Sequence, residues 1–260
     1  MRAIGIVAAL EMEIAELLGL MQADEDRHRI GRRDYYTGSL LGCPCVIVLA
    51  RVGKVAAAAT TVTLIREFGV ASVVFTGVAG AISRHVNVGD VVVAQSLLQH
   101  DLDARPLFPR YEVPLLGLSH FDADPDLTRR LSSCATEYLR QDLVADGPAR
   151  AQLSAQFGIT RPAVHGGMII SGDSFINDAQ HVEALRTSLP DALCVEMEGA
   201  AVAQVCHEYD VPYAVMRTIS DRADGSAGID FNAFLQAAAS RYATGILRRF
   251  FALQRERDAA

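Results

Sequence analysis

Acidic and hydroxyl side chains follow short apolar runs at four places in this sequence. The four places are Glu11 with Glu13, the segment Thr76 to Gly80, the segment Cys194 to Gly199 and the segment Arg217 to Asp221. Carboxyl groups can donate or accept a proton during a reaction, and glycines let a backbone approach a ligand closely. The pattern therefore suggests acid–base chemistry on a bound ligand.

Each place also has a purely structural interpretation. Glu13 can be an exposed residue in the first turn of a helix, where the helix dipole favours a negative charge. The glycines of the second place do not fit G-x-G-x-x-G and can form a simple turn, while the carboxylates of the third can end a strand and cap a helix. The serine and aspartate of the fourth can cap the next segment of the chain. The coincidence favours a site, because three carboxylates at three strand ends are costly to bury unless they are used.

Other reactive residues give weaker signals. His100 and Asp101 could form a general base with its orienting carboxylate, or a hydrogen-bonded structural pair. Cys43 and Cys45 lack the spacing and the second half of a metal site, so no metal is expected there. The chain has no H-E-x-x-H, Walker A or G-x-S-x-G motif, which weighs against zinc hydrolases, P-loop enzymes and α/β-hydrolases.

The composition is that of a chain able to bury a large core. Half of the 260 residues are apolar and 21% are charged. The net charge of −7, with no cluster of basic residues, argues against a nucleic-acid partner and favours a small ligand. Five cysteines without disulfide spacing indicate a reducing compartment. Since Glu11 and Glu13 interrupt any signal peptide and no run reaches 18 apolar residues, we expect a cytoplasmic protein without a membrane partner.

Short β-branched runs alternate with segments of helical period, which predicts an α/β fold. Strands are expected over Ala3 to Ala9, Tyr36 to Leu40, Cys45 to Leu49, Ser72 to Phe75, Val91 to Ala94, Val164 to Ser171, Leu193 to Glu196 and Tyr213 to Ser220. Helices are expected over Glu13 to Leu20, Gly53 to Glu67, Pro125 to Leu143, Ala179 to Ser188, Gly199 to Tyr209 and Phe231 to about Leu253. Ligands of open α/β sheets bind at the carboxyl ends of the strands, where these places would meet. Without repeats or polar linkers, residues 1–260 are expected to form a single domain.

Residues 101–125 form an unusual stretch. They contain four of the nine prolines, together with Phe108, Tyr111 and Phe121. Such a stretch cannot be regular structure throughout. Because long loops in a compact domain are usually lids, binding loops or interface elements, we expect one of these roles.

The four places belong to a series of motifs that covers nearly the whole chain. The motifs are Gly5 to Glu13, Val52 to Ala58, Thr76 to Gly80, Val88 to Asp90, Ser171 to Asn177, Val195 to Glu198 and Arg217 to Asp221. The order S-G-D-x-F-I-N, V-E-M-E and R-x-I-S-D is specific. On these motifs the chain resembles the nucleoside phosphorylase and nucleosidase superfamily, specifically the 5′-methylthioadenosine/S-adenosylhomocysteine nucleosidases. The resemblance implies a three-layer α/β/α fold with a mixed central sheet, a homodimer and a reaction that needs no cofactor or metal.

The resemblance also implies a reaction and its catalytic residues. Water would hydrolyse the N-glycosidic bond of 5′-methylthioadenosine or S-adenosylhomocysteine and release adenine and a thioribose. Asp221 would give a proton to purine N7, oriented by Ser220, and needs a raised pKa that burial would supply. Glu13 would be the base for the attacking water, helped by Arg217. Glu198 would hold the ribose 2′ and 3′ hydroxyls.

A further set of residues would contact the nucleoside. The backbone of the second place would approach it closely, and adenine, sugar and the 5′-alkylthio group would each meet their own side chains. The residues implied are Val78, Ala79 and Gly80 for the close approach, Phe175 and Ile176 for adenine, Met197 for the sugar, and Val52, Phe108, Tyr111, Pro114 and Phe231 for the 5′ group. Some of the last set would reach in from the second subunit of a dimer.

Two departures from the family pattern keep alternatives open. Val78 stands where many relatives carry a serine, and Arg51 could offer a cation to an anionic group. A purine nucleoside phosphorylase is therefore an alternative, although the carboxylate of Glu13 would repel phosphate and activate water. A non-catalytic nucleoside-binding protein is another, although binding alone does not require Glu13, Glu198 and Asp221 together. The 5′ substituent is open among methylthioadenosine, adenosylhomocysteine, deoxyadenosine and futalosine-type substrates.

Overall fold

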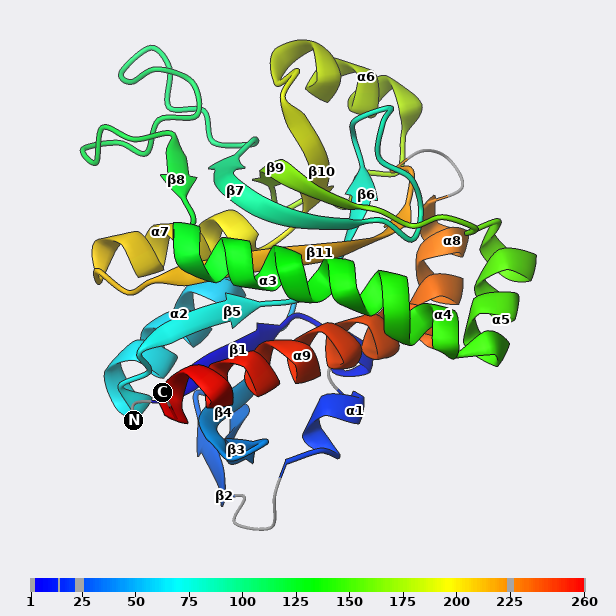
Figure 1. The fold of residues 1–260 in the computed structure, drawn as a ribbon. Coiled ribbons are helices and arrows are strands. Elements are labelled where there is room, and N and C mark those ends of the chain that lie inside the picture. Colours follow the sequence, from blue (N-terminus) through cyan, green and yellow to red (C-terminus); the bar gives the residue numbers. More distant parts are fainter. Residues whose placement is uncertain (1–2, 14, 22–25, 224–226, 260) are drawn as a thin grey trace.

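A mixed β-sheet lies between two layers of helices (Figure 1). The computed structural model describes residues 3–13, 15–21, 26–223 and 227–259, and only the backbone of residues 227–230. In this part of the chain, eleven strands are ordered β2-β3-β4-β1-β5-β11-β6-β10-β9-β7-β8, with an additional pairing of β11 and β7. The strands are β1 (Ile4–Ala8), β2 (Asp26–Ile30), β3 (Arg33–Leu40), β4 (Cys43–Leu49), β5 (Ser72–Phe75), β6 (Val78–Ala81), β7 (Val91–Gln99), β8 (His120–Asp122), β9 (Val164–Ser171), β10 (Ala192–Glu196) and β11 (Tyr213–Asp221). The predicted fold class is confirmed.

Helices cover both faces of the sheet. On one face lie α3 (Pro125–Glu137) and α9 (Ser240–Ala259), and on the other lie α2 (Lys54–Phe68) and α7 (Gly199–Glu208) (Figure 1). The other helical segments are η1 (Glu11–Glu13), α1 (Ala15–Leu18), η2 (Tyr138–Asp142), α4 (Leu143–Ala145), α5 (Gly147–Phe157), α6 (Ala179–Ser188), α8 (Ala227–Phe234) and η3 (Leu235–Ala239). No helix in the described ranges is long and apolar enough to cross a membrane.

Strand β1 shows why two layers of helices are needed. Its five residues are all buried. Because successive side chains of a strand point to opposite faces, Ile4 and Ile6 enter the core beneath α3 and α9, while Val7 enters the core beneath α2 and α7. Parallel strands that are buried on both faces have this near-continuous apolar sequence.

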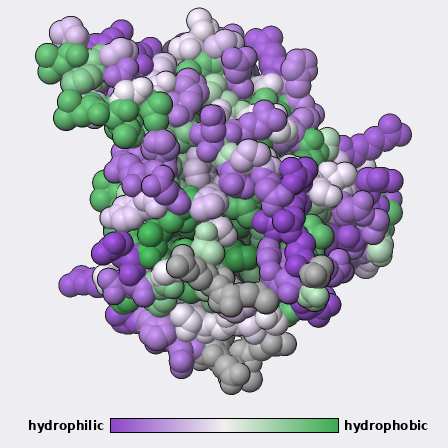
Figure 2. All heavy atoms as spheres, turned by 60° about the vertical axis from the view of Figure 1, so that its left-hand side comes forward, coloured by the Kyte–Doolittle hydropathy of each residue, from purple (hydrophilic) through white to green (hydrophobic). Residues whose placement is uncertain are grey.

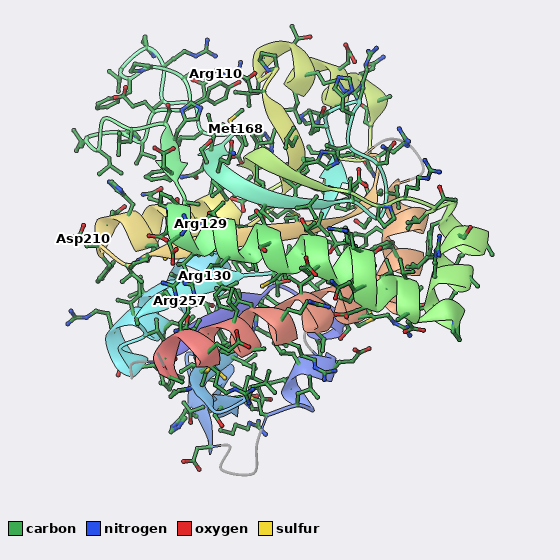
Figure 3. The ribbon with its side chains drawn as sticks, in the orientation of Figure 1. Arg110, Arg129, Arg130, Met168, Asp210 and Arg257 are labelled. Carbon is green, nitrogen blue, oxygen red and sulfur yellow. The ribbon has the colours of Figure 1, made fainter. Side chains whose placement is uncertain are left out.

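The helices α3 and α9 are fastened to each other by polar contacts. Arg130 donates a hydrogen bond to Gln254 at 2.6 Å, and Arg257 lies 3.5 Å from the carboxylate of Asp126. Figure 3 shows Arg129, Arg130 and Arg257 where these two helices lie side by side. The pair covers β1 and β11 and so supports the strands that carry the site.

Several elements differ from the sequence predictions. Thr76 to Gly80 was expected to be a turn, but Val78–Ala81 forms β6 and pairs with β10 and β11. A Cβ atom on Gly80 would lie 2.9 Å from Asp221 Oδ1, so the small residues allow strands to approach closely instead of turning the chain. Residues 13–20 do not form one helix, the final helix is divided by the π-helical η3, and β2 and α5 were not predicted.

The segment between β7 and β8 leaves the sheet and projects at the upper left of Figure 1. Apart from an isolated bridge between Val113 and Leu118, its described backbone is irregular, as its prolines predicted. Leu107 and Leu115 are 82% and 92% exposed. Figure 2 shows hydrophobic side chains gathered on the projecting lobe at its upper left. The segment thus presents an apolar surface away from the sheet.

Candidate active site

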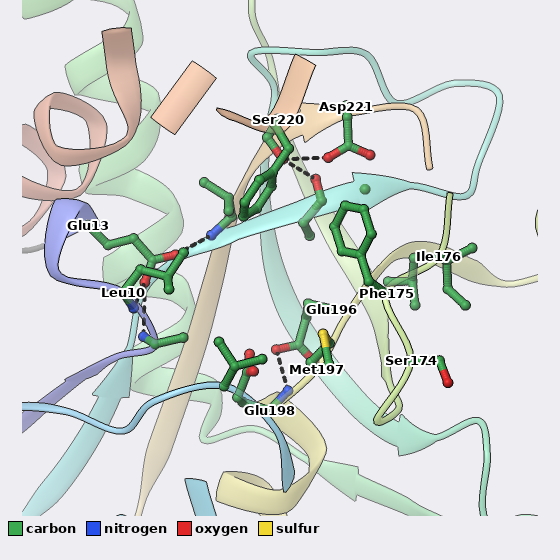
Figure 4. A pocket seen from close by; sticks show the side chains of 17 residues that line it. Leu10, Glu13, Ser174, Phe175, Ile176, Glu196, Met197, Glu198, Ser220 and Asp221 are labelled. Atoms are coloured by element: carbon green, nitrogen blue, oxygen red, sulfur yellow. Dashed lines mark hydrogen bonds between the residues drawn. The ribbon is translucent and has the colours of Figure 1, made fainter. Parts of the chain in front are cut away.

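A pocket of about 570 Å³ opens at the carboxyl ends of β1, β10 and β11 (Figure 4). This is the edge of the sheet where the sequence placed a site. The lining residues are Ala9, Leu10, Glu13, Val52, Val78, Ala79, Gly80, Ser174, Phe175, Ile176, Val195, Glu196, Met197, Glu198, Ser220, Asp221 and Phe231. The structure therefore brings together residues from six separate motifs of the chain.

Most of the predicted site residues belong to this lining. Of the predicted catalytic residues, Glu13, Glu198, Ser220 and Asp221 line the pocket, and the fully buried Arg217 lies behind it. The predicted binding residues in the lining are Val52, Val78, Ala79, Gly80, Phe175, Ile176, Met197 and Phe231.

Three predicted binding residues lie elsewhere in the chain. Phe108, Tyr111 and Pro114 belong to the segment between β7 and β8 and do not line this pocket. Tyr111 packs against a buried apolar cluster, and the guanidinium of Arg110 lies 4.6 Å from its ring centre. Their contribution to the site of a second subunit stays a prediction.

Glu13 is a buried carboxylate, so its interpretation as an exposed helix residue is wrong. It is 2% exposed, because η1 turns its side chain inward after β1. Its carboxylate accepts hydrogen bonds from the N–H groups of Ala9 at 2.9 Å, Leu10 at 2.8 Å and Val78 at 3.2 Å. Burial raises the pKa of Glu13, although these N–H groups and Arg217 act to lower it. A carboxylate with a raised pKa is suited to accept a proton near neutral pH.

Arg217 supplies a positive charge behind the pocket. Its guanidinium donates to Glu196 Oε2 at 2.6 Å and lies 3.9 Å from the centre of the Phe75 ring. Burial opposes its charge, but the carboxylates of Glu196 and Glu198 raise the pKa of Arg217. One buried cation therefore compensates part of a cluster of carboxylates.

Glu196 is a site residue that the sequence analysis did not include. Its carboxylate accepts hydrogen bonds from Ser171 Oγ, from the N–H of Glu198 at 3.1 Å and from the N–H of Gly199 at 2.8 Å. It thus satisfies N–H groups at the start of α7 while it pairs with Arg217. Its place in V-E-M-E, with a helix starting three residues later, was the signal for this role. Ala9, Leu10, Ser174 and Val195 were also missed, and each is a neighbour of a predicted residue in the same motif.

Glu198 joins the pocket to helix α2. Its Oε1 accepts a hydrogen bond from the N–H of Gly53 at 2.7 Å. Gly53 has φ of 99°, a conformation that favours glycine, and it starts α2. Burial and the nearby Glu196 raise the pKa of Glu198 to about 8. The carboxyl group therefore holds its proton at neutral pH while the site is empty.

Ser220 and Asp221 form the opposite wall of the pocket (Figure 4). Ser220 Oγ donates to Asp221 Oδ2 at 2.7 Å, and the N–H of Ala223 donates to Oδ1 at 2.7 Å. The register of β11 against β6 shifts between Ile219 and Asp221. Such an irregularity re-aims a side chain at the end of a strand. The contact expected between Ser220 and Asp221 is present, and both residues are buried.

Apolar side chains form the outer part of the pocket. The rings of Phe175 and Phe231 meet edge to face with their centres 5.5 Å apart. Phe175 is 46% exposed and Val52 is 51% exposed, so this part is open to solvent. Flat apolar walls beside buried polar groups suit a ligand with an aromatic ring and a polar centre.

Comparisons with known proteins agree with this architecture. Residues 3–252 match the sequence profile of the phosphorylase superfamily. The chain is 34% identical over 239 residues to the 5′-methylthioadenosine/S-adenosylhomocysteine nucleosidase of Actinobacillus succinogenes, with 92% of this chain and 94% of that one covered. It is also 34% identical over 238 residues to the protein of that name from Staphylococcus aureus, with 91% and 93% covered.

Solved structures give the same result. The nucleosidase of that name from Neisseria meningitidis, in complex with methylthio-immucillin-A, superposes with a TM-score of 0.82 at 30% identity, covering 96% of this chain and 98% of that one. Futalosine hydrolase of Helicobacter pylori superposes with a TM-score of 0.79 at 29% identity, covering 95% and 97%. The chain therefore belongs to the phosphorylase superfamily and, within it, to the family of the 5′-methylthioadenosine/S-adenosylhomocysteine nucleosidases.

Proposed function

We propose that this protein hydrolyses the N-glycosidic bond of 5′-methylthioadenosine and S-adenosylhomocysteine and releases adenine and a 5-thioribose. The observation that carries the proposal is the opposition of two buried acid–base groups across one pocket. Asp221 with Ser220 forms one wall and Glu13 lies on another, while Phe175 lies at the open side. The names of the relatives and the inhibitor bound to the Neisseria meningitidis enzyme support this substrate class.

The chemistry of the bond explains this arrangement. Cleavage of an N-glycosidic bond passes through an oxocarbenium-like sugar, so the departing base must be neutralised and positive charge at C1′ must be favoured. Asp221 would protonate purine N7 as the bond from C1′ to N9 breaks. Glu13 would take a proton from the water that forms the new bond to C1′. Glu198 would hold the ribose 2′ and 3′ hydroxyls above Met197.

The charges of the pocket favour water over phosphate as the nucleophile. Glu13 is fully buried and accepts three backbone hydrogen bonds beside Val78. The guanidinium of Arg217 is already paired with Glu196 at 2.6 Å. A phosphate anion would therefore meet a carboxylate where a phosphorylase needs unpaired cations. This arrangement disfavours the phosphorylase alternative.

A homodimer would complete the outer part of the pocket. Exposed apolar side chains occur near its mouth and on the segment between β7 and β8, and their exposure in a single chain supports an interface there. The residues are Val52, Val55, Leu107, Leu115 and Phe175. In this proposal Phe108, Tyr111 and Pro114 of one subunit cover the 5′ group bound by the other.

The cellular role follows from the products. Release of adenine and methylthioribose returns both parts of methylthioadenosine to metabolism, and we propose a part in methionine salvage in the cytoplasm. The five cysteines are buried and free, which suits a reducing compartment.

Product analysis tests the reaction directly. The purified protein is incubated with 5′-methylthioadenosine or S-adenosylhomocysteine, with and without phosphate, and the products are separated. We expect adenine and the free thioribose in equal amounts at the same rate in both conditions. Formation of a ribose 1-phosphate that requires phosphate would make the protein a phosphorylase. No adenine under either condition, with tight nucleoside binding, would make it a binding protein.

A further inference from the structure

The single lysine of the chain lies in a charged cluster beside the pocket. Lys54 is the one lysine among 24 basic residues, and its side chain is 16% exposed. Its Nζ lies 2.5 Å from Asp101 Oδ1 and 3.8 Å from Asp173 Oδ2. An ammonium group is compact and carries three donors, so it can contact two carboxylates that the fork of an arginine would separate. The lysine thus joins the end of β7 to the loop after β9.

Backbone groups add to this cluster. The N–H of Lys54 donates to Asp173 Oδ1 at 2.8 Å, and the N–H of Asp173 donates to Asp101 Oδ2 at 2.9 Å. Although burial acts to raise it, hydrogen bonds from Lys54 and Asp173 hold the pKa of Asp101 below its usual value. Asp101 therefore acts as an ionised partner of Lys54, and no hydrogen bond joins it to the described His100 side chain, contrary to the pair that their adjacency suggested.

The cluster is connected to both ligand-facing parts of the pocket. Asp173 is two residues before Phe175, which lines the pocket. Gly53, the neighbour of Lys54, donates its N–H to Glu198 at 2.7 Å. The first turn of α2 thus holds the loop of residues 172–177 and the carboxylate of Glu198 in one arrangement.

The loop is also packed closely from the other side. The N–H of Gly172 donates to the carbonyl of Glu196 at 3.1 Å. A Cβ atom on Gly172 would lie 2.3 Å from the imidazole of His100. Because the start of the loop is fixed by packing, the contacts of Asp173 with Lys54 and Asp101 decide how the chain continues to Phe175.

We propose that Lys54 is a positioning residue for nucleoside binding. Its ammonium group, through Asp101 and Asp173, fixes the loop of residues 172–177 so that Phe175 and Ile176 are in place before the ligand enters. The inference rests on the proposed function, since it assigns Phe175 and Ile176 to the nucleoside. Lys54 does not line the pocket and takes no part in proton transfer.

Kinetics of Lys54→Met test the proposal. The variant keeps the length of the side chain and removes its charge. Loss of an interaction that acts equally on the ground state and the transition state raises KM and leaves kcat unchanged. We expect KM for 5′-methylthioadenosine to rise about tenfold, as for loss of one charge-assisted contact, with kcat within about threefold of wild type. Lys54→Arg should recover part of the loss, and Arg84→Met, which removes an exposed ion pair with Glu183, should have no effect.

Two further measurements separate positioning from a general loss of stability. Asp101→Asn should raise KM like Lys54→Met, and the double variant should be no worse than either single one, because the pair acts as a unit. Amide hydrogen exchange of the ligand-free protein should be faster at residues 172–177 in Lys54→Met and unchanged in β1 and β11.

The outcomes for the two proposals are distinct. A folded Lys54→Met variant with wild-type KM and wild-type exchange at residues 172–177 would overturn the role of Lys54 and leave the proposed function intact. A wild-type protein that releases no adenine would overturn the proposed function, and exchange at residues 172–177 would then decide whether Lys54 positions the loop.

Discussion

The inner and outer halves of the pocket are built in different ways. The inner half comprises Glu13, Glu196, Glu198, Ser220 and Asp221, with Arg217 behind them, and each of these residues is at most 7% exposed. The outer half comprises Val52, Phe175 and Phe231, which lie on loops and on α8, outside the sheet. Polar groups with fixed partners occupy the first half, and apolar groups open to solvent occupy the second.

This difference separates reaction from selection of the substrate. Fixed donors and acceptors stabilise a transition state without reorganising during the reaction, and the ends of buried strands hold them rigidly. Loops can vary in sequence without disturbing the sheet. We therefore expect substitutions in the inner half to lower kcat and substitutions in the outer half to change KM. Single substitutions in each half test that division.

Asp221→Asn should have the largest effect. An asparagine keeps the shape of the side chain but cannot protonate the departing purine. Loss of a general acid typically lowers rates 10²–10⁴-fold, so we expect kcat to fall about 10³-fold while KM changes less than about threefold. Steady-state kinetics of adenine release would measure both, with the exposed Asp191→Asn as control. Wild-type turnover in Asp221→Asn would remove the residue from the mechanism.

Glu13→Gln should come second, with a fall in kcat of about 10²-fold from loss of the base. Glu11→Gln is a matched control, because Glu11 is in the same 3-10 turn but exposed. The same assay with added phosphate makes the result sharper. If the neutral amide of the Glu13→Gln variant admitted phosphate and restored cleavage as a ribose 1-phosphate, the carboxylate would be the group that excludes phosphate. Equal activity of Glu13→Gln and Glu11→Gln would contradict the role of the base.

The two halves also differ in how well the sequence predicted them. Asp221 and Glu13 could be placed because each follows a buried strand, and the carboxyl ends of strands meet at one edge. Glu196 was missed because its role depends on partners far along the chain, Ser171 and Arg217. The residues of the 101–125 segment could not be placed, because an irregular segment has no period that fixes where its side chains point. The strand β6 was missed because its small residues lack a β-branched pattern.

Glu198→Gln should change how stability depends on pH. The pKa of Glu198 is raised to about 8 from 4.5, so between these values the folded protein holds a proton that the unfolded chain releases. The free energy of unfolding should therefore fall as pH rises from about 5 to 8, with a slope that approaches 1.4 kcal/mol per pH unit from this group. Denaturant unfolding at several pH values would show a smaller slope in Glu198→Gln. The exposed Glu208→Gln is the control, and an unchanged slope in Glu198→Gln would show that other groups set it.

Val52→Ala should have the smallest effect and is confined to the outer half. Removal of two methylene equivalents from a side chain that is 51% exposed loses less than full burial would, so KM for 5′-methylthioadenosine should rise about threefold with kcat unchanged. KM for adenosine, which lacks the alkylthio group, should stay the same. Val144→Ala is a matched control, because Val144 is 48% exposed and lies on α4 away from the pocket. A fall in kcat for both nucleosides would mean that Val52 supports the inner half, and the division between the two halves would then be wrong.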